Sequence, residues 1–166
     1  TEVIFHNAAK VSVRGSGINY LEDAQVNILG TLRVLEACKV NKIKKLVLSS
    51  SVSVYGNQNI LKVKEETALN PISPYGISKL ASEKYCEFVC KQCGIKLITL
   101  RYFNVFGTRQ AFSTDIGVIP FFINTAVRDK TLTVIGDGNQ VRDFVSVNDV
   151  VRANLLAMKG NFDYQV

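Results

Sequence analysis

Buried-strand and amphipathic-helix patterns alternate along the first hundred residues of the chain. Short apolar runs, typical of strands covered on both faces, occupy residues 3–5, 46–48 and 95–100. Between them, apolar residues recur every three or four positions, which predicts helices over residues 23–40 and 75–93, the second ending at Gly94. This order of strands and helices predicts an α/β fold with a parallel sheet.

The second half of the chain has a less regular pattern. Residues 118–129 predict a helix, and residues 132–135 and 143–147 predict short strands on either side of a glycine-rich turn. Asn148 is a suitable N-cap for a last helix that runs to Lys159. This half could form a smaller lobe set against the sheet.

Composition and charge exclude several classes of protein. The chain has 166 residues and a net charge of +6, but its basic residues are scattered, so we expect no nucleic-acid partner. No apolar run approaches the roughly 18 to 20 residues of a membrane-spanning helix, so we expect no membrane partner. The chain opens directly in a predicted strand and ends at what could be the entry to another, so we expect a portion of a longer protein.

Polar residues follow each of the three predicted strands. In open parallel sheets, ligands bind outside the carboxyl ends of the strands. The alternative is that these residues are simply polar loop starts. The three segments are His6-Asn7-Ala8-Ala9, Ser49-Ser50-Ser51 and Tyr102-Phe103-Asn104.

Tyr75 and Lys79 carry the strongest chemical signal in the chain. Four residues apart, they lie on one face of the predicted helix, and a nearby ammonium favours the phenolate form of tyrosine. The phenol could then work as an acid or base near neutral pH. A serine hydroxyl such as that of Ser51 could hold a substrate oxygen beside it. Without the serines, such a pair is more often a solvated helix face.

Ser51 followed by Tyr75-x-x-x-Lys79 resembles the catalytic pattern of the extended short-chain dehydrogenase/reductase family. Further stretches resemble its sugar-nucleotide epimerase/dehydratase branch, in order and over nearly the whole chain. They are His6-Asn7-Ala8-Ala9, Asn27-Ile28-Leu29-Gly30-Thr31, Ser50-Ser51-Val52-Ser53-Val54-Tyr55-Gly56, Pro71-Ile72-Ser73-Pro74-Tyr75-Gly76, Arg101-Tyr102-Phe103-Asn104-Val105-Phe106-Gly107 and Gly136-Asp137-Gly138-x-x-Val141-Arg142-Asp143-Phe144.

The resemblance implies a Rossmann-like parallel sheet with flanking helices and part of a smaller substrate-binding lobe. Residues 1–107 would be the catalytic part of the NAD-binding domain, without its first strands. Residues 108–166 would be a partial substrate-binding lobe and the return to the first domain. It also implies a homodimer, and the cysteine pattern, typical of reduced thiols, predicts a cytoplasmic location.

The resemblance further implies which residues carry the activity. Tyr75 would act as base on a sugar hydroxyl while the sugar carbon gives hydride to NAD, Lys79 would hold the nicotinamide ribose and lower the phenol pKa, and Ser51 would hydrogen-bond the reacting oxygen. The implied cofactor-binding residues are Asn7, Ala8, Ala9, Asn27, Ser49, Ser50, Tyr75, Lys79, Tyr102 and Phe103. The implied residues for a nucleoside-diphosphate sugar are Ser12, Ser51, Tyr75, Asn104 and Arg142.

Two of these residues have alternative interpretations. Asn27 could be an ordinary polar residue inside its helix. Arg142 could form an ion pair with Asp143 or Asp149.

The residues after Ser51 narrow the reaction. Related dehydratases and decarboxylases carry acidic residues where this chain has Val52 and Ser53, which favours an epimerase, with UDP-hexose 4-epimerisation as the leading hypothesis. A keto-sugar-nucleotide reductase or dehydratase, or an inactive fragment, remains the alternative. The chain contains no G-x-G-x-x-G turn for the cofactor phosphates, so we expect no stable NAD binding by these residues alone.

The cysteines and the single histidine are expected to be structural. Cys86, Cys90 and Cys93 have the C-x-x-x-C-x-x-C spacing of an iron–sulfur loop, but they fall on one face of a predicted helix and should pack in the core. Unpaired thiols are typical of a reducing compartment. His6 alone makes no metal site, so none is expected.

Overall fold

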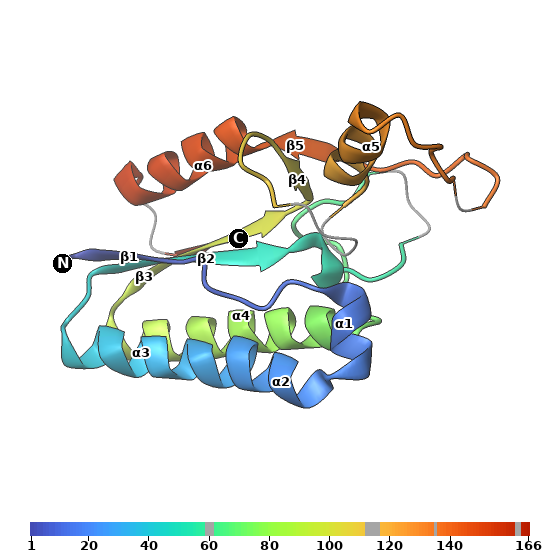
Figure 1. The fold of residues 1–166 in the computed structure, drawn as a ribbon. Helices are drawn as coiled ribbons and strands as arrows, with labels where there is room; N and C mark the ends of the chain where they lie inside the picture. Colours follow the sequence, from blue (N-terminus) through green and yellow to red (C-terminus); the bar gives the residue numbers. More distant parts are fainter. Residues whose placement is uncertain (59–61, 112–116, 135, 162–163) are drawn as a thin grey trace.

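A four-stranded parallel sheet forms the centre of the computed structural model, which describes residues 1–58, 62–111, 117–134, 136–161 and 164–166 (Figure 1). The strands are β1 (Val3–His6), β2 (Lys45–Ser51), β3 (Lys96–Tyr102) and β6 (Tyr164–Gln165), in the spatial order β1-β2-β3-β6. The predicted Rossmann-like α/β class is confirmed, and β6 adds a short strand where the chain ends.

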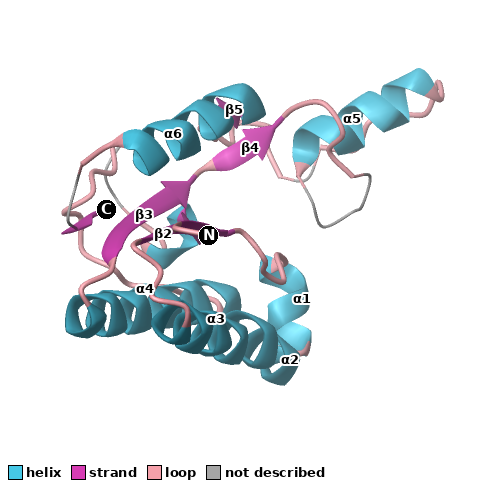
Figure 2. Cartoon of the chain, turned by 90° about the vertical axis from the view of Figure 1, so that its left-hand side faces the viewer, coloured by secondary structure: helices cyan, strands magenta, loops and turns pink. Residues whose placement is uncertain are grey.

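Helices cover both faces of this sheet. On one face lie α3 (Gly30–Val40) and α4 (Pro74–Cys93), and α6 (Val147–Lys159) lies on the other (Figure 2). The side chain of Ser73 caps the first turn of α4, and Gly94 ends that helix at φ 66°, a left-handed conformation that glycine adopts without strain.

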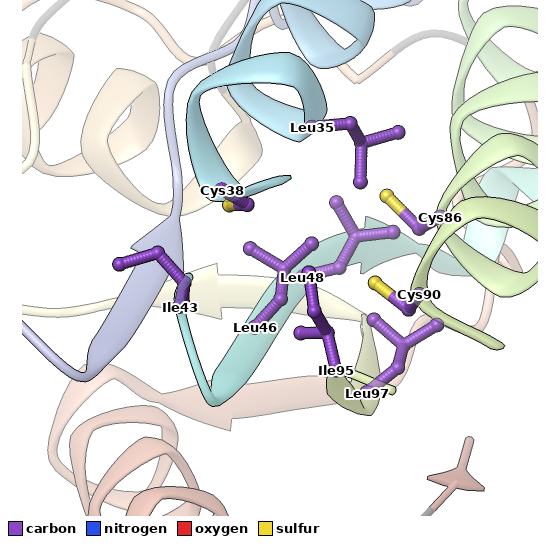
Figure 3. Packing of buried hydrophobic residues seen from close by; sticks show 9 residues of the cluster. All are labelled: Leu35, Cys38, Ile43, Leu46, Leu48, Cys86, Cys90, Ile95 and Leu97. Carbon is purple, nitrogen blue, oxygen red and sulfur yellow. The ribbon is translucent and has the colours of Figure 1, made fainter. Parts of the chain in front are cut away.

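Successive side chains of β2 point to opposite faces of the sheet, so the hydrophobic core has two parts, one on each face. Leu46 and Leu48 face α3 and α4, where they pack with the cluster shown in Figure 3, and Val47 faces Ala157 of α6. Cys86 and Cys90 are buried in the first cluster, which confirms their predicted packing role. Cys93 is exposed, so the prediction was wrong for the third thiol.

The helix predicted over residues 23–40 is divided into three segments. It comprises α2 (Tyr20–Ala24), a π-helical turn at Gln25–Leu29, and α3. A further short helix, α1 (Val13–Ile18), precedes it and was not predicted. Its sequence contains two glycines and too few turns to show an apolar period.

The second half of the chain forms a separate two-stranded parallel sheet beside α5 (Val118–Val127). Its strands are β4 (Asn104–Phe106) and β5 (Phe144–Ser146). The strand predicted at 132–135 is wrong for residues 132–134, which are irregular, and Ile135 lies outside the described residues.

The last helix begins earlier than predicted. Ser146, whose side chain accepts a hydrogen bond from the backbone amide of Asn148, is the N-cap of α6, so the prediction of Asn148 as cap was wrong by two residues. At the other end, the buried ammonium of Lys45 donates to the carbonyls of Ala157, Met158 and Gly160. This fastens the C-terminus of α6 to β2. Among the described helices, none has the length and apolar character needed to cross a bilayer.

Candidate active site

The carboxyl ends of β1, β2 and β3 bring the three predicted polar segments together. Ser49 lies between the other two segments, because its hydroxyl is 2.6 Å from Oδ1 of Asn7 and 3.3 Å from the hydroxyl of Tyr102. The parallel register pairs Ser49 with Leu100 and Ser51 with Tyr102, so β2 and β3 end side by side. The polar strand ends therefore form one connected edge.

The first turn of α4 delivers Tyr75 to this edge. The hydroxyl of Ser16 accepts a hydrogen bond of 3.1 Å from the backbone amide of Tyr75. A Cβ at Gly76 would lie 2.6 Å from the carbonyl oxygen of Ser53, so only glycine permits this approach of the helix to the turn that follows β2. The close approach places the phenol of Tyr75 within hydrogen-bonding reach of the Ser51 hydroxyl.

Burial controls the acidity of the phenol. Loss of solvent raises the pKa of Tyr75 above its usual value near 10, the hydrogen bond from Ser51 lowers it, and the negative charge of Asp23 raises it further. This direction is opposite to the lowered pKa that was expected from the proximity of Lys79. Burial, rather than the charge of Lys79, has the largest effect on this phenol.

Lys79 is a buried ammonium one helical turn beyond Tyr75. Its side chain is 5% exposed, and within the described ranges no hydrogen bond is formed by its Nζ. Burial lowers its pKa, while Cys86, Glu83 and Asp23 raise it, and its charge also helps lower the pKa of His6. An unbonded buried ammonium is costly, which makes it a suitable donor for the hydroxyl or carbonyl oxygens of a ligand.

Asn27 lies in the π-helical turn and holds the segment after β1. Its Oδ1 accepts a hydrogen bond of 2.8 Å from the backbone amide of Lys10, and its Nδ2 donates one of 3.1 Å to the Lys10 carbonyl. It also bonds Ser78 and Asp23 at 3.1 Å each. The side chain is 2% exposed and joins three segments, so it is more than an ordinary polar residue inside a helix.

Asp23 is a site residue that the sequence did not reveal. Its side chain is buried, and its Oδ2 is without a hydrogen-bond partner in the described part of the chain. In the sequence it marks only the start of the helix predicted over residues 23–40. The buried location depends on packing of α2 against α4, which local sequence does not encode.

Ser50 points away from the predicted cofactor edge. Its hydroxyl donates to Glu83 of α4, and the same carboxylate receives two bonds from Arg101 of β3, at 3.0 and 2.8 Å. The ion pair is nearly buried, and the Arg101 guanidinium also bonds and stacks on Tyr55. Strand alternation turns the Ser50 side chain toward the α4 face, and its role in cofactor binding stays a prediction.

The remaining predicted residues lie around this centre without converging on it. Ser12 caps α1 through the amide of Gly15, and Asn104 donates to the carbonyl of Asp143 at 2.8 Å. Arg142 is exposed and bonds the Val141 carbonyl, and in the described ranges it has no ion pair with Asp143 or Asp149. Ala8 and Ala9 follow β1 at the edge, and Phe103 borders a cavity of about 540 Å³ between β3 and α6.

His6 is a structural residue, as predicted. It is buried, and its Nε2 is 2.9 Å from the hydroxyl of Thr31 on α3. Burial, and then the charge of Lys79, lower its pKa, so the imidazole is held neutral. No group of metal-ligating side chains is found among the residues that the structure describes.

The fold is that of a Rossmann-like α/β protein, and Ser51, Tyr75 and Lys79 are its candidate acid–base residues near the carboxyl ends of the strands. The chain belongs to the NAD dependent epimerase/dehydratase family, whose model matches residues 1–165.

Three solved structures show how similar the chain is to its relatives. A UDP-N-acetylglucosamine 4-epimerase from Methanobrevibacter ruminantium, in complex with UDP-N-acetylmuramic acid, superposes with a TM-score of 0.96 at 38% identity over 100% of this chain. The UDP-glucose 4-epimerase of Thermotoga maritima, with UDP-glucose, has a TM-score of 0.94 and 41% identity over 99% of this chain. The UDP-glucuronic acid 4-epimerase of Bacillus cereus, with UDP-glucuronic acid and NAD, has a TM-score of 0.90 and 35% identity over 99% of this chain. The chain spans only 52 to 54% of these proteins.

Proposed function

We propose that the protein carrying this chain is an NAD-dependent epimerase of a nucleoside-diphosphate sugar, and that it inverts C4 of a UDP-hexose. One observation carries the proposal: the phenol of Tyr75 and the hydroxyl of Ser51 meet at the carboxyl end of β2, one helical turn from the buried ammonium of Lys79. Family membership and the three solved 4-epimerases support the choice of reaction.

The residues at the edge fit a dinucleotide. Lys79 is an unbonded buried donor within the described residues, suited to ribose hydroxyls, and the small side chains of Ala8 and Ala9 allow a flat group to approach the backbone. With Asn7, Tyr102 and Phe103 they would hold NAD, which supplies a hydride acceptor and donor when bound. The 166 residues contain no glycine-rich phosphate turn, so we propose that these residues alone do not retain the cofactor.

The protein's own groups would move the proton and orient the sugar. In the protein without ligand, burial raises the pKa of Tyr75, so the phenol is neutral. Bringing positive charge close to it, from Lys79 and a bound nicotinamide, would favour the phenolate that takes the proton of a sugar hydroxyl. Ser51 would hold the reacting oxygen, and the same phenol would return the proton after the keto sugar presents its other face.

Val52 and Ser53 favour epimerisation over elimination of water. These residues form the 3-10 turn after β2, beside Ser51, and neither can act as a general acid for a leaving hydroxyl. Ser12, Asn104 and Arg142 would contact the sugar nucleotide. The guanidinium of Arg142 is exposed and suited to a diphosphate.

We further propose a homodimer in the cytoplasm, with residues 1–107 in the cofactor domain and 108–166 in the substrate lobe and its return. The helices beside the site expose large apolar side chains that a second copy could cover. They include Val26, Leu29, Tyr85 and Phe88, which are 42 to 65% exposed. Four free thiols suit a reducing compartment.

Turnover of the complete protein on a panel of UDP-sugars tests the proposal. UDP-glucose, UDP-N-acetylglucosamine and UDP-glucuronate are each incubated with the NAD-loaded protein, and the C4 epimers are separated by chromatography. Epimer formation from at least one sugar, with no net change in NADH absorbance, is expected. Loss of water from the sugar, or stoichiometric NADH consumption, would show a dehydratase or a reductase instead.

A further inference from the structure

A chain of hydrogen bonds links α6 to the carboxyl ends of all three long strands. Nδ2 of Asn154 is 2.6 Å from the hydroxyl of Tyr102. The Tyr102 hydroxyl is 3.3 Å from Oγ of Ser49, and that Oγ is 2.6 Å from Oδ1 of Asn7. Asn154 lies on α6, outside every sequence motif of the site. The other three residues are candidates for cofactor binding.

The backbone of α6 sets the direction of this chain. The carbonyl of Val150 is 2.8 Å from Nδ2 of Asn154 and can only accept, so that end of the amide must be the NH₂ group. The Tyr102 hydroxyl therefore accepts from Asn154. Ser49 has one proton and two possible acceptors, Oδ1 of Asn7 at 2.6 Å and the Tyr102 hydroxyl at 3.3 Å, and the shorter contact takes it, so Tyr102 is the donor to Ser49. The Ser49 proton then goes to Asn7.

The direction decides which end of the Asn7 amide meets a ligand. Because Oδ1 of Asn7 receives the Ser49 proton, Nδ2 is the group left for the exposed side of the strand edge. If these hydrogen bonds ran in the opposite direction, Ser49 would accept a hydrogen bond from Nδ2 of Asn7. Oδ1 of Asn7 would then face the ligand.

Stability alone does not account for Asn154. Its Oδ1 is buried and has no partner in the part of the chain that the structure describes, which is a cost rather than a gain. A leucine of similar size would remove this unpaired acceptor. The Asn154 amide therefore acts through its NH₂ group, which donates hydrogen bonds to Tyr102 and to the Val150 carbonyl.

We propose that Asn154 is a positioning residue, which acts through Tyr102 and Ser49 to hold Asn7 with its NH₂ group toward an acceptor oxygen of the bound dinucleotide. This inference rests on the proposed function. It predicts energetic coupling between two side chains, on α6 and after β1, that do not touch.

A double-mutant cycle on NAD affinity tests the coupling in the complete protein. The variants are Asn154→Leu, Asn7→Ala and their combination, with Asn148→Leu as the matched change at an exposed position of α6. The dissociation constant of NAD is measured by isothermal titration calorimetry. Asn7→Ala should weaken binding by about tenfold and Asn154→Leu by about fivefold, as for loss of one neutral hydrogen bond. In the Asn7→Ala background, Asn154→Leu should add less than a twofold change.

Equal weakening by Asn154→Leu in both backgrounds, or none in either, would overturn the inference. If Asn154→Leu does not fold, Ser49→Ala takes its place, because it removes the hydrogen bond next to Asn7. This variant should show the same coupling to Asn7→Ala. A wild-type protein that binds no NAD would overturn the proposed function together with this inference. NAD binding without coupling would overturn the inference alone.

Discussion

Glu83→Ala should destabilise the protein far more than an ordinary surface substitution on the same helix. The Glu83 carboxylate is only 6% exposed and accepts two bonds from Arg101, whose side chain is 8% exposed, as well as one from Ser50. Alanine removes all three bonds and leaves the guanidinium buried without its counter-charge. Breaking one side of a buried pair costs about 3–5 kcal/mol.

Urea unfolding of the complete protein at pH 7, followed by circular dichroism, measures this cost. Glu87→Ala is the matched control: Glu87 lies one turn further along α4, and its ion pair with Lys84 is 3.0 Å long but exposed on both sides. That change should cost about 0.5 kcal/mol or less. Adding Arg101→Met to Glu83→Ala should restore part of the stability, because it removes the unpaired charge.

A loss for Glu83→Ala no greater than that for Glu87→Ala would refute the reasoning. It would mean that water solvates Arg101 once Glu83 is gone, and that the pair does not hold α4 against the sheet.

Three further predictions concern the buried titratable groups. Lys79→Met should raise the melting temperature of the cofactor-free protein at pH 7 while abolishing turnover, because burial disfavours the ammonium it removes; a lower melting temperature would contradict this. The lowered pKa of His6 contributes stability that is present above about pH 6.5 and is lost as the pH falls, so His6→Gln should flatten the decline in melting temperature between about pH 7 and 5. An unchanged decline would show that the neutral imidazole is not what the fold requires. Of the four thiols, Cys93 should react rapidly with a disulfide reagent in the native protein, and the rest only on unfolding, because they are buried and burial raises their pKa values, that of Cys90 to about 12. The slow thiols are those of Cys38, Cys86 and Cys90.

Local patterns predicted the parts of the fold that have a simple period. The three long strands and α4 have apolar runs or helical spacing, and their caps are encoded within a few residues, as with Ser73 and Gly94. The segment at Asp23–Val40 showed one helical period, yet the structure inserts a π-helical turn at Gln25–Leu29. That turn places Asn27 against Lys10, a contact across 17 residues that no local pattern contains.

The candidate site shows the same division. Ser51, Tyr75 and Lys79 belong to a motif, and the structure brings Tyr75 close to Ser51 at the end of β2, with Lys79 buried one helical turn further along α4. Their electrostatics did not follow from spacing, because burial, a property of the whole fold, raises the pKa of Tyr75 where the neighbouring lysine was expected to lower it. Asp23 and Asn154 went unnoticed because their neighbours come from other elements.

Tyr75→Phe tests the central claim most directly, because it removes one hydroxyl and keeps the ring that fills the site. The complete protein is loaded with NAD, and epimerisation of its preferred UDP-sugar is measured beside the dissociation constant of NAD. The account predicts that turnover falls by at least 10³-fold, about 4 kcal/mol of barrier, with NAD affinity within a few-fold of wild type. Undiminished turnover would contradict the role of Tyr75 as the acid–base group.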